Sequence, residues 1–241
     1  MTASPGLCAL PGGYGDNRQV CGQLLAACVV HAIIPDVGGK QDETAIDKRP
    51  VAGPVEVHAL GLTGDTQCDV ANHGGEGRAV YAYAQEDADW WSKDLDRELP
   101  PGSFGENLRT RGLDVTGALL GERWRIGTTL LEVSCPRTPC LSFQGFWGVP
   151  RLIKRFIAYG APGAYLRVLE EGQVQAGDDI EITHRPDHGV TLGLALRALT
   201  VERGLLTRLA PALDSFPDRD RARLARLIEH SAQIAGAPLP S

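Results

Sequence analysis

Short apolar runs separated by turn-forming residues constrain the fold of this chain more than any other feature of its sequence. The runs begin at Leu25 and recur as far as His184, with turn-forming residues such as glycine, proline, asparagine and aspartate between them. Runs of this length, bounded in this way, predict β-strands, and many short strands in one chain are typical of a β-barrel or a β-sandwich. The predicted strands lie at residues 25–34, 55–60, 79–83, 122–126, 129–134, 165–169 and 179–184. We therefore expect a mainly β fold.

Two segments interrupt the strand pattern with the spacing of a helix. Residues 85–99 place Trp91 and Leu95 four positions apart, and residues 149–159 repeat apolar side chains on one helical face. This spacing is typical of amphipathic helices. We expect both helices to flank the β domain and to cover part of its core.

The pattern changes after Arg185, where Pro186 and Gly189 indicate a linker. The residues beyond are rich in leucine, alanine and arginine and lack strand alternation, which predicts a small helical domain at 190–235 after a β domain at 24–185. In its last helix the arginines alternate with acidic residues or alanine, a pattern typical of a solvated face; they are Arg219, Arg221, Arg223 and Arg226. Residues 1–23 lack apolar periodicity and are expected to form a flexible N-terminal extension.

Charge and hydropathy exclude several classes of protein. The formal charge of -6 argues against nucleic acid or an anionic lipid surface as a partner. The chain lacks both a run of roughly 18 apolar residues for a membrane span and the basic start and apolar core of a signal peptide. We therefore expect a cytoplasmic protein without membrane contact. The six cysteines form no C-x-x-C pair, and a reducing compartment favours them as thiols.

The loop that leaves the predicted strand at 129–134 carries the most unusual chemistry. Pro136 and Pro139 fix its backbone, and Arg137 lies three residues before Cys140. A cation near a thiol favours the thiolate, which is a good ligand for soft metals. The residues alone also allow Cys140 to be a small buried apolar side chain, the more common role of a lone cysteine.

A glycine-rich segment at residues 72–78 could hold an anion. Gly74 and Gly75 allow the backbone to approach a ligand closely, and His73 and Arg78 can donate hydrogen bonds. The alternative is a simple glycine turn.

Two further pairs of polar residues could contribute to a site. Lys48 and Arg49 are adjacent cations of the kind that hold phosphate or carboxylate, and solvated surface charges are the alternative. Glu106 and Asn107 lie between Phe104 and Leu108, where the carboxylate could orient a basic group or cap a turn.

These segments belong to a larger ordered set: residues 45–50 (AIDKRP), 61–65 (GLTGD), 73–75 (HGG), 104–108 (FGENL), 121–127 (GERWRIG) and 136–140 (PRTPC). In this order they resemble the MOSC domain, the family related to the C-terminal part of molybdenum cofactor sulfurase, and within it the YiiM-like branch. The resemblance covers roughly residues 25–184, and the tail is similar to the small three-helix domain that follows the barrel in YiiM-like proteins. It implies a MOSC-type β-barrel with flanking helices.

The resemblance also implies a cofactor, the pyranopterin molybdenum cofactor, with Cys140 as the thiolate ligand of the metal. The cofactor-binding residues that it implies are Lys48, Arg49, His73, Gly74, Gly75, Arg78, Arg137 and Cys140. The catalytic candidates are Cys140, His73, Glu106 and Asn107. The helical tail supplies none of them, so we expect the barrel to work alone, unless the apolar stripe of the tail packs on the barrel as core.

The activity implied by the resemblance is the two-electron reduction of N-hydroxylated compounds to an amine or amidine and water. The chain shows neither a dinucleotide fingerprint nor four clustered cysteines, so an external flavoprotein or iron–sulfur protein is expected to donate the electrons. A homodimer is compatible with the sequence. Two alternatives stay open: a Cys/His hydrolase with Cys140 as nucleophile and His73 as base, and a carrier of sulfur or molybdenum cofactor that uses Cys140.

Overall fold

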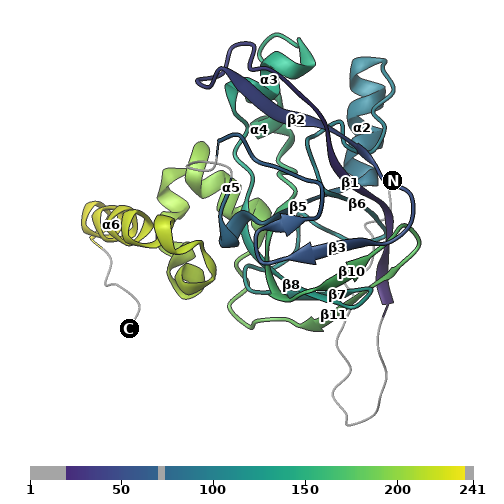
Figure 1. Cartoon of the computed structure of the whole chain (residues 1–241). Coiled ribbons are helices and arrows are strands. Elements are labelled where there is room, and N and C mark those ends of the chain that lie inside the picture. The colour runs from purple at the N-terminus through teal and green to yellow at the C-terminus, as the bar shows by residue number, and fades with distance from the viewer. Residues whose placement is uncertain (1–19, 70–73, 237–241) are drawn as a thin grey trace.

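The strands close into a β-barrel (Figure 1). In the computed structural model, which describes residues 20–69 and 74–236, the ring order is β11-β7-β8-β9-β5-β6-β1, and β1 pairs with β11 to close it. Neighbouring strands are antiparallel except β5 and β6, which are parallel. The barrel strands are β1 (Val20–Pro35), β5 (Val80–Ala84), β6 (Leu108–Arg111), β7 (Arg123–Ile126), β8 (Thr129–Pro136), β9 (Ala164–Glu170) and β11 (Asp179–His184). The predicted mainly β fold is confirmed.

Strand β1 is long because two parts of the fold share it. Its residues from Gln23 to Ala27 pair with β6 inside the barrel, and those from Cys28 to Pro35 pair with β2 (Glu43–Pro50) outside it. The sequence pattern did not predict β2, whose second half contains the polar residues Asp47, Lys48 and Arg49. It also placed residues 20–23 in the N-terminal extension, whereas they belong to β1. A separate small sheet contains β3 (Val55–His58), β4 (Gly61–Leu62) and β10 (Gly172–Val174).

Figure 1 shows three helices gathered at one end of the barrel: α2 (Gln85–Leu95), α3 (Leu141–Trp147) and α4 (Leu152–Tyr159). Helices α2 and α4 correspond to the two predicted ones, and α3 was not predicted. Buried aromatic rings pack together there: the ring centroids of Phe143 in α3 and Phe156 in α4 are 5.4 Å apart, and those of Trp147 in α3 and Phe104, in the loop before β6, are 4.8 Å apart. This aromatic cluster anchors the start of α3, which directly follows Cys140.

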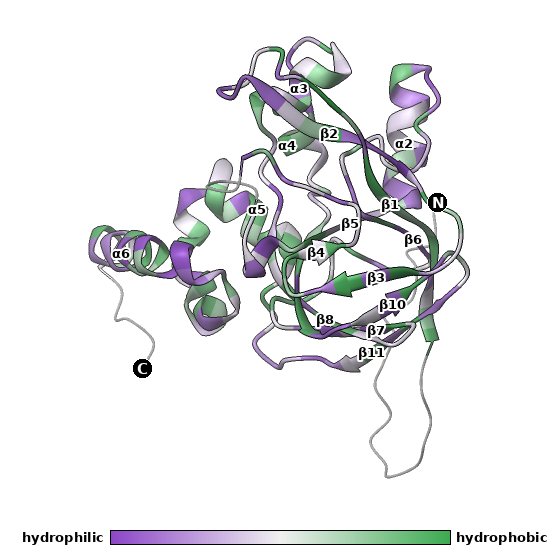
Figure 2. Ribbon diagram, viewed as in Figure 1, coloured by the Kyte–Doolittle hydropathy of each residue, from purple (hydrophilic) through white to green (hydrophobic). Residues whose placement is uncertain are grey.

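The tail after the barrel contains α5 (Leu192–Thr200), a 3-10 helix η2 (Arg203–Ser215) and α6 (Asp218–Ala235). Thr191 caps α5 by accepting a hydrogen bond from the Leu194 backbone N–H, at 3.1 Å. Buried side chains of α5 and η2, among them Leu192 and Leu209, belong to the same core cluster as the barrel residue Trp124. Figure 2 shows apolar and polar residues alternating around α6, as in an amphipathic helix. The tail therefore packs on the barrel through ordinary core contacts.

Four cysteines, Cys28, Cys68, Cys135 and Cys140, carry thiols, whereas Cys21 is in a disulfide, which corrects the expectation that all six are thiols. None of the helices within residues 20–69 and 74–236 combines the length and the apolar character that a membrane crossing requires.

Candidate functional site

A pocket beside Cys140 brings together residues that are far apart in the sequence. Its wall includes strands β2, β5 and β9, the loop between β8 and α3, and the short 3-10 helix η1 (Glu76–Arg78). The residues with polar side chains on this wall include Lys48, Arg78, Tyr81, Asn107, Arg137, Cys140 and Tyr165. We call this the inner pocket.

Cys140 is half-buried and lies directly before the first turn of α3. Strand β8 ends at Pro136, and the chain then turns through Arg137, Thr138 and Pro139 to reach it. Proline fixes the backbone angle φ, so this loop has little freedom to move the thiol. Cys140 therefore lines the inner pocket from a loop whose backbone two prolines restrict.

Arg137 is a fixed cation in the wall of the inner pocket. Its guanidinium lies 4.8 Å from the ring centroid of Tyr81 and 4.6 Å from that of Phe143, and it donates a hydrogen bond to the Phe104 carbonyl. Burial by itself would lower the pKa of Arg137, but neighbouring groups, Tyr81 first and Cys140 among them, hold it above the ordinary value. Within the described part of the chain, its buried Nε has no hydrogen-bond partner. A bound group with acceptor atoms would satisfy that donor.

Lys48 is a second buried cation, paired with Asp65. Only 8% of the Lys48 side chain and 3% of the Asp65 side chain are exposed. Asp65 also accepts hydrogen bonds from Asn107 Nδ2 at 2.7 Å and from the Val30 N–H at 3.0 Å. Burial lowers the pKa of Lys48, and the Asp65 carboxylate opposes that shift. Asp65 thus holds the lysine in place, a role that its position at the end of the GLTGD segment could have indicated.

Asn107 lines the inner pocket, but its side chain is engaged with the protein. Besides Asp65, its Nδ2 donates to the Cys28 carbonyl at 3.2 Å, and its Oδ1 accepts from the Tyr81 N–H at 3.1 Å. These bonds join β1 to β5. The geometry gives Asn107 a positioning function, which differs from the catalytic one that the resemblance implies.

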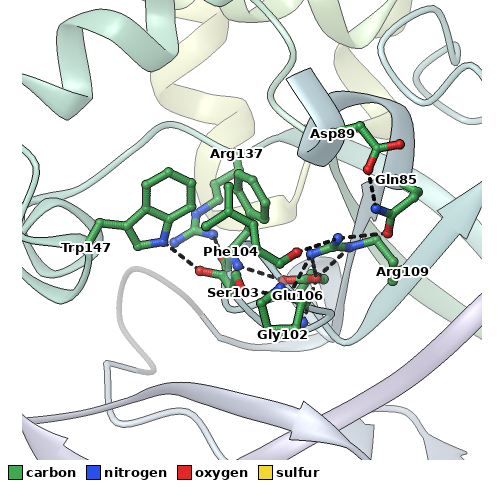
Figure 3. Close-up of polar contacts among 11 residues, drawn as sticks. Gln85, Asp89, Gly102, Ser103, Phe104, Glu106, Arg109, Arg137 and Trp147 are labelled. Atoms are coloured by element: carbon green, nitrogen blue, oxygen red, sulfur yellow. Dashed lines mark hydrogen bonds and ion pairs between the residues drawn. The ribbon is translucent and has the colours of Figure 1, made fainter. Parts of the chain in front are cut away.

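Glu106 does not line the inner pocket and is fully buried. Its carboxylate accepts hydrogen bonds from the N–H groups of Gly102 at 2.7 Å and Phe104 at 2.9 Å, and from Arg109 Nε at 2.8 Å (Figure 3). A Cβ added at Gly102 would lie 2.0 Å from the Lys48 carbonyl, so the loop that Glu106 braces touches β2. This geometry gives Glu106 a bracing role, because the carboxylate is buried and does not line the inner pocket, and the catalytic role that the resemblance implies stays a prediction.

The other predicted residues are spread over a wider area. The side chain of Arg49 is 58% exposed, pairs with Asp47 at 3.2 Å and does not line the inner pocket. Gly74 and Gly75 line a neighbouring cavity that the first residues of α6 complete. His73 lies outside the described residues. Of the predicted cofactor contacts, the structure brings Lys48, Arg78, Arg137 and Cys140 together.

The donor set decides what kind of metal group the site fits. In the described residues, no group of three or more His, Cys, Asp or Glu side chains could hold a metal ion. Cys140 can supply one soft thiolate, so further ligands must come from the bound group itself. The buried cations Lys48 and Arg137 suit a phosphate on that group. The residues present therefore fit a metal held by an anionic organic cofactor, and they do not fit a bare ion.

The chain is similar to known proteins in sequence and in structure. A MOSC domain model matches residues 69–181. The Bacillus subtilis protein YflK is 36% identical over 159 residues, which are 66% of this chain and 72% of YflK. A Gibberella moniliformis protein named "Reductase" is 33% identical over 77% of this chain, and the match spans only 35% of that longer protein.

Solved structures agree with the sequence comparison. The crystal structure of YiiM from Geobacillus stearothermophilus superimposes with a TM-score of 0.71 at 25% identity, over 86% of this chain and 99% of that one. Escherichia coli YiiM is 31% identical in sequence over 59% of this chain and 65% of its own length. Its crystal structure gives a TM-score of 0.61. This chain belongs to the MOSC domain family, in the branch that contains YiiM.

Proposed function

We propose that this protein is a molybdenum-cofactor-binding oxidoreductase that reduces N-hydroxylated compounds with electrons from an external redox protein. The observation that carries the proposal is the half-buried Cys140 thiol in a pocket walled by the buried cations Lys48 and Arg137. A relative that bears the name "Reductase" supports a redox activity.

The residues of the inner pocket divide the work of holding the cofactor. Cys140 would supply the protein's thiolate ligand, and Lys48 and Arg137 would bind the phosphate and other acceptor atoms. Because the rings of Tyr81 and Phe143 fix the Arg137 guanidinium, this cation needs little rearrangement when the group binds. When bound, the cofactor supplies the two-electron redox chemistry of molybdenum.

Tyr165 is the side chain of the inner pocket best placed to contact a substrate through a neutral hydroxyl. It lines both the inner pocket and the space outside Cys140. Burial raises the pKa of Tyr165, so its hydroxyl stays protonated near neutral pH and can donate a hydrogen bond. We assign it the binding of the N-hydroxyl oxygen.

The electrons would come from a separate flavoprotein or iron–sulfur protein. Within residues 20–69 and 74–236 the chain offers no cluster of metal-ligating side chains that could hold an iron–sulfur group. Reduction of an N-hydroxyl group to an amine and water consumes two electrons and two protons, so a donor protein and solvent must supply them.

The test is the metal content and activity of protein made in a host that synthesises the cofactor. We expect molybdenum and pterin at about one per chain, and we expect Cys140→Ala to lose both together with reduction of benzamidoxime. Cys135→Ala is the matched control, because it removes the same group five residues earlier from a buried position outside the pocket. Metal-free wild-type protein that still turns over a substrate would refute the proposal, as would equal loss in the two variants.

A further inference from the structure

A second pocket also borders Cys140, and we call it the outer pocket because its arginines Arg219 and Arg223 are exposed. It shares Cys140, Arg78 and Tyr165 with the inner pocket. Helix α6 completes it with Arg219, Asp220 and Arg223. A molecule that reaches Cys140 through the outer pocket therefore passes along the first turns of α6.

The start of α6 is held tightly against the glycine-rich segment of the barrel. Asp220 pairs with Arg78 at 2.6 Å. A Cβ added at Gly77 would lie 2.7 Å from Pro217 Cβ, so the two chains touch where glycine leaves room. These contacts join residues about 140 positions apart, with 142 between Arg78 and Asp220. The position of α6 at the pocket is part of the fold.

Several cations converge on the outer pocket. Lys40, Arg78, Arg219 and Arg223 line it, together with the acids Asp36, Asp69 and Asp220. Asp220 pairs with Arg78, and Asp36 accepts hydrogen bonds from Ser142 Oγ at 2.9 Å and the Gln41 N–H at 3.3 Å.

Arg219 and Arg223 lie on the side of α6 that faces the outer pocket. They are one helical turn apart and so project on the same side of the helix. Partial loss of solvation, and then the nearby charge of Arg78, lower the pKa of Arg219. An anion bound beside these guanidinium groups would relieve their mutual repulsion.

We propose that the outer pocket recognises a carboxylate or phosphate group on the substrate, with Arg219 and Arg223 as the residues that determine this specificity. The inference rests on the proposed function and deepens it. The position of the cations favours substrate over cofactor, because Lys48 and Arg137 are buried in the inner pocket whereas Arg219 and Arg223 are exposed in the outer pocket. The planar guanidinium fork matches both anions.

The first experiment tests the anion site without catalysis. Protein purified from a host that synthesises the cofactor, so that the cofactor occupies Lys48 and Arg137, is titrated with inorganic phosphate at low ionic strength, and the dissociation constant is measured by calorimetry. We expect the double variant Arg219→Ala/Arg223→Ala to bind phosphate about tenfold or more weakly than the wild type, the change that a lost charge-assisted contact produces. Arg226→Ala is the matched control, since it removes the same charge from the same helix at a position that lines neither pocket. Equal binding by the wild type and the double variant would overturn the proposal.

The second experiment identifies the source of the anionic group. The ratio of kcat/KM for 4-carboxybenzamidoxime to that for benzamidoxime is measured in cofactor-loaded protein. We expect the double variant to lower this ratio about tenfold and the Arg226→Ala control to keep it. An unchanged ratio would overturn the assignment to substrate. So would loss of molybdenum from the double variant, which would assign the anion to the cofactor.

Failure of the proposed function would look different. A wild-type protein that binds phosphate through Arg219 and Arg223 but reduces neither compound would refute the reductase activity, and the phosphate result would still establish the anion site.

Discussion

Replacing Glu106 by glutamine separates a structural role from a catalytic one. The Glu106 and Arg109 side chains are both fully buried and paired, and the same carboxylate accepts hydrogen bonds from two backbone N–H groups. Glutamine keeps the shape but removes the charge, which leaves the Arg109 guanidinium buried without a counterion. The NH₂ group of its amide is a hydrogen-bond donor, and it would face the N–H donors of Gly102, Phe104 or Arg109 that the carboxylate now accepts from.

The expected loss of stability follows from that geometry. Removing one partner of a buried ion pair costs about 3–5 kcal/mol. For a chain of this size each kcal/mol lowers the melting temperature by roughly 2–4 °C, so Glu106→Gln should melt roughly 6–20 °C below the wild type. Guanidinium unfolding, followed by fluorescence of the four tryptophans, would measure the free energy directly.

The matched control is Glu170→Gln. Glu170 pairs with Arg125 at 2.6 Å, but 54% of its side chain is exposed, so the same substitution should change stability little. Unfolding of Glu106→Gln at the wild-type denaturant concentration would contradict the structural role of the Glu106–Arg109 pair. A variant of wild-type stability that has lost activity would support the catalytic role that the resemblance implied.

Three further predictions concern stability. Asp65→Asn leaves the buried Lys48 ammonium without its counterion and should cost about 3–5 kcal/mol in guanidinium unfolding; an unchanged free energy would mean that Lys48 has another partner. Burial raises the pKa of Asp87 from 3.8 to about 6, so the folded protein binds this proton more tightly and wild-type stability falls as pH rises through that window. Asp87→Asn should therefore be the more stable protein above pH 6, by at most roughly 3 kcal/mol, and equal urea midpoints at pH 5 and pH 8 in both proteins would contradict this. A chain that ends at Arg185 should be insoluble, because it exposes the core surface that Leu192 and Leu209 cover, and a soluble, cofactor-loaded truncation would show instead that the barrel works alone.

Most strands of the barrel could be predicted because they carry their own signal, whereas the barrel strand β6 coincides with no predicted apolar run. Strands β5, β7, β8, β9 and β11 each coincide with a predicted apolar run to within a few residues. Strand β2 could not be predicted in this way, since it contains Asp47, Lys48 and Arg49 and, among the described residues, pairs with β1 alone, along the residues from Cys28 to Pro35. A strand with one partner has no need for apolar side chains on both faces, so periodicity does not reveal it.

The sequence predicted the role of only some of the side chains at the candidate site. The loop from Pro136 to Cys140 has a local signal, because two prolines and an arginine lie within five residues. The roles of Glu106 and Asn107 had no such signal, because burial and hydrogen-bond partners decide whether a carboxylate or an amide contacts a ligand or braces a loop. Asn107 bonds to backbone groups of Tyr81 and Cys28, which are remote in sequence, and sequence spacing does not record those contacts. Glu106 accepts hydrogen bonds from the nearby N–H groups of Gly102 and Phe104, one of the two roles that the sequence left open for it.

The arginines of α6 are a second case in which the sequence does not reveal the role of a side chain. Here the sequence predicts solvated charges, and the structure places two of them at a pocket. Their alternation with acids and alanine predicts a solvated face, and helical periodicity places Arg219, Arg223 and Arg226 on one side of the helix. Periodicity alone does not show which of these three arginines lines a pocket. The contact of Pro217 with Gly77 and the ion pair of Asp220 with Arg78 bring the first two turns to the pocket, and Arg226 lies beyond it. The difference between a solvated charge and a specificity residue is thus set by contacts between the tail and the barrel, which is why Arg226 is the control that decides the proposal.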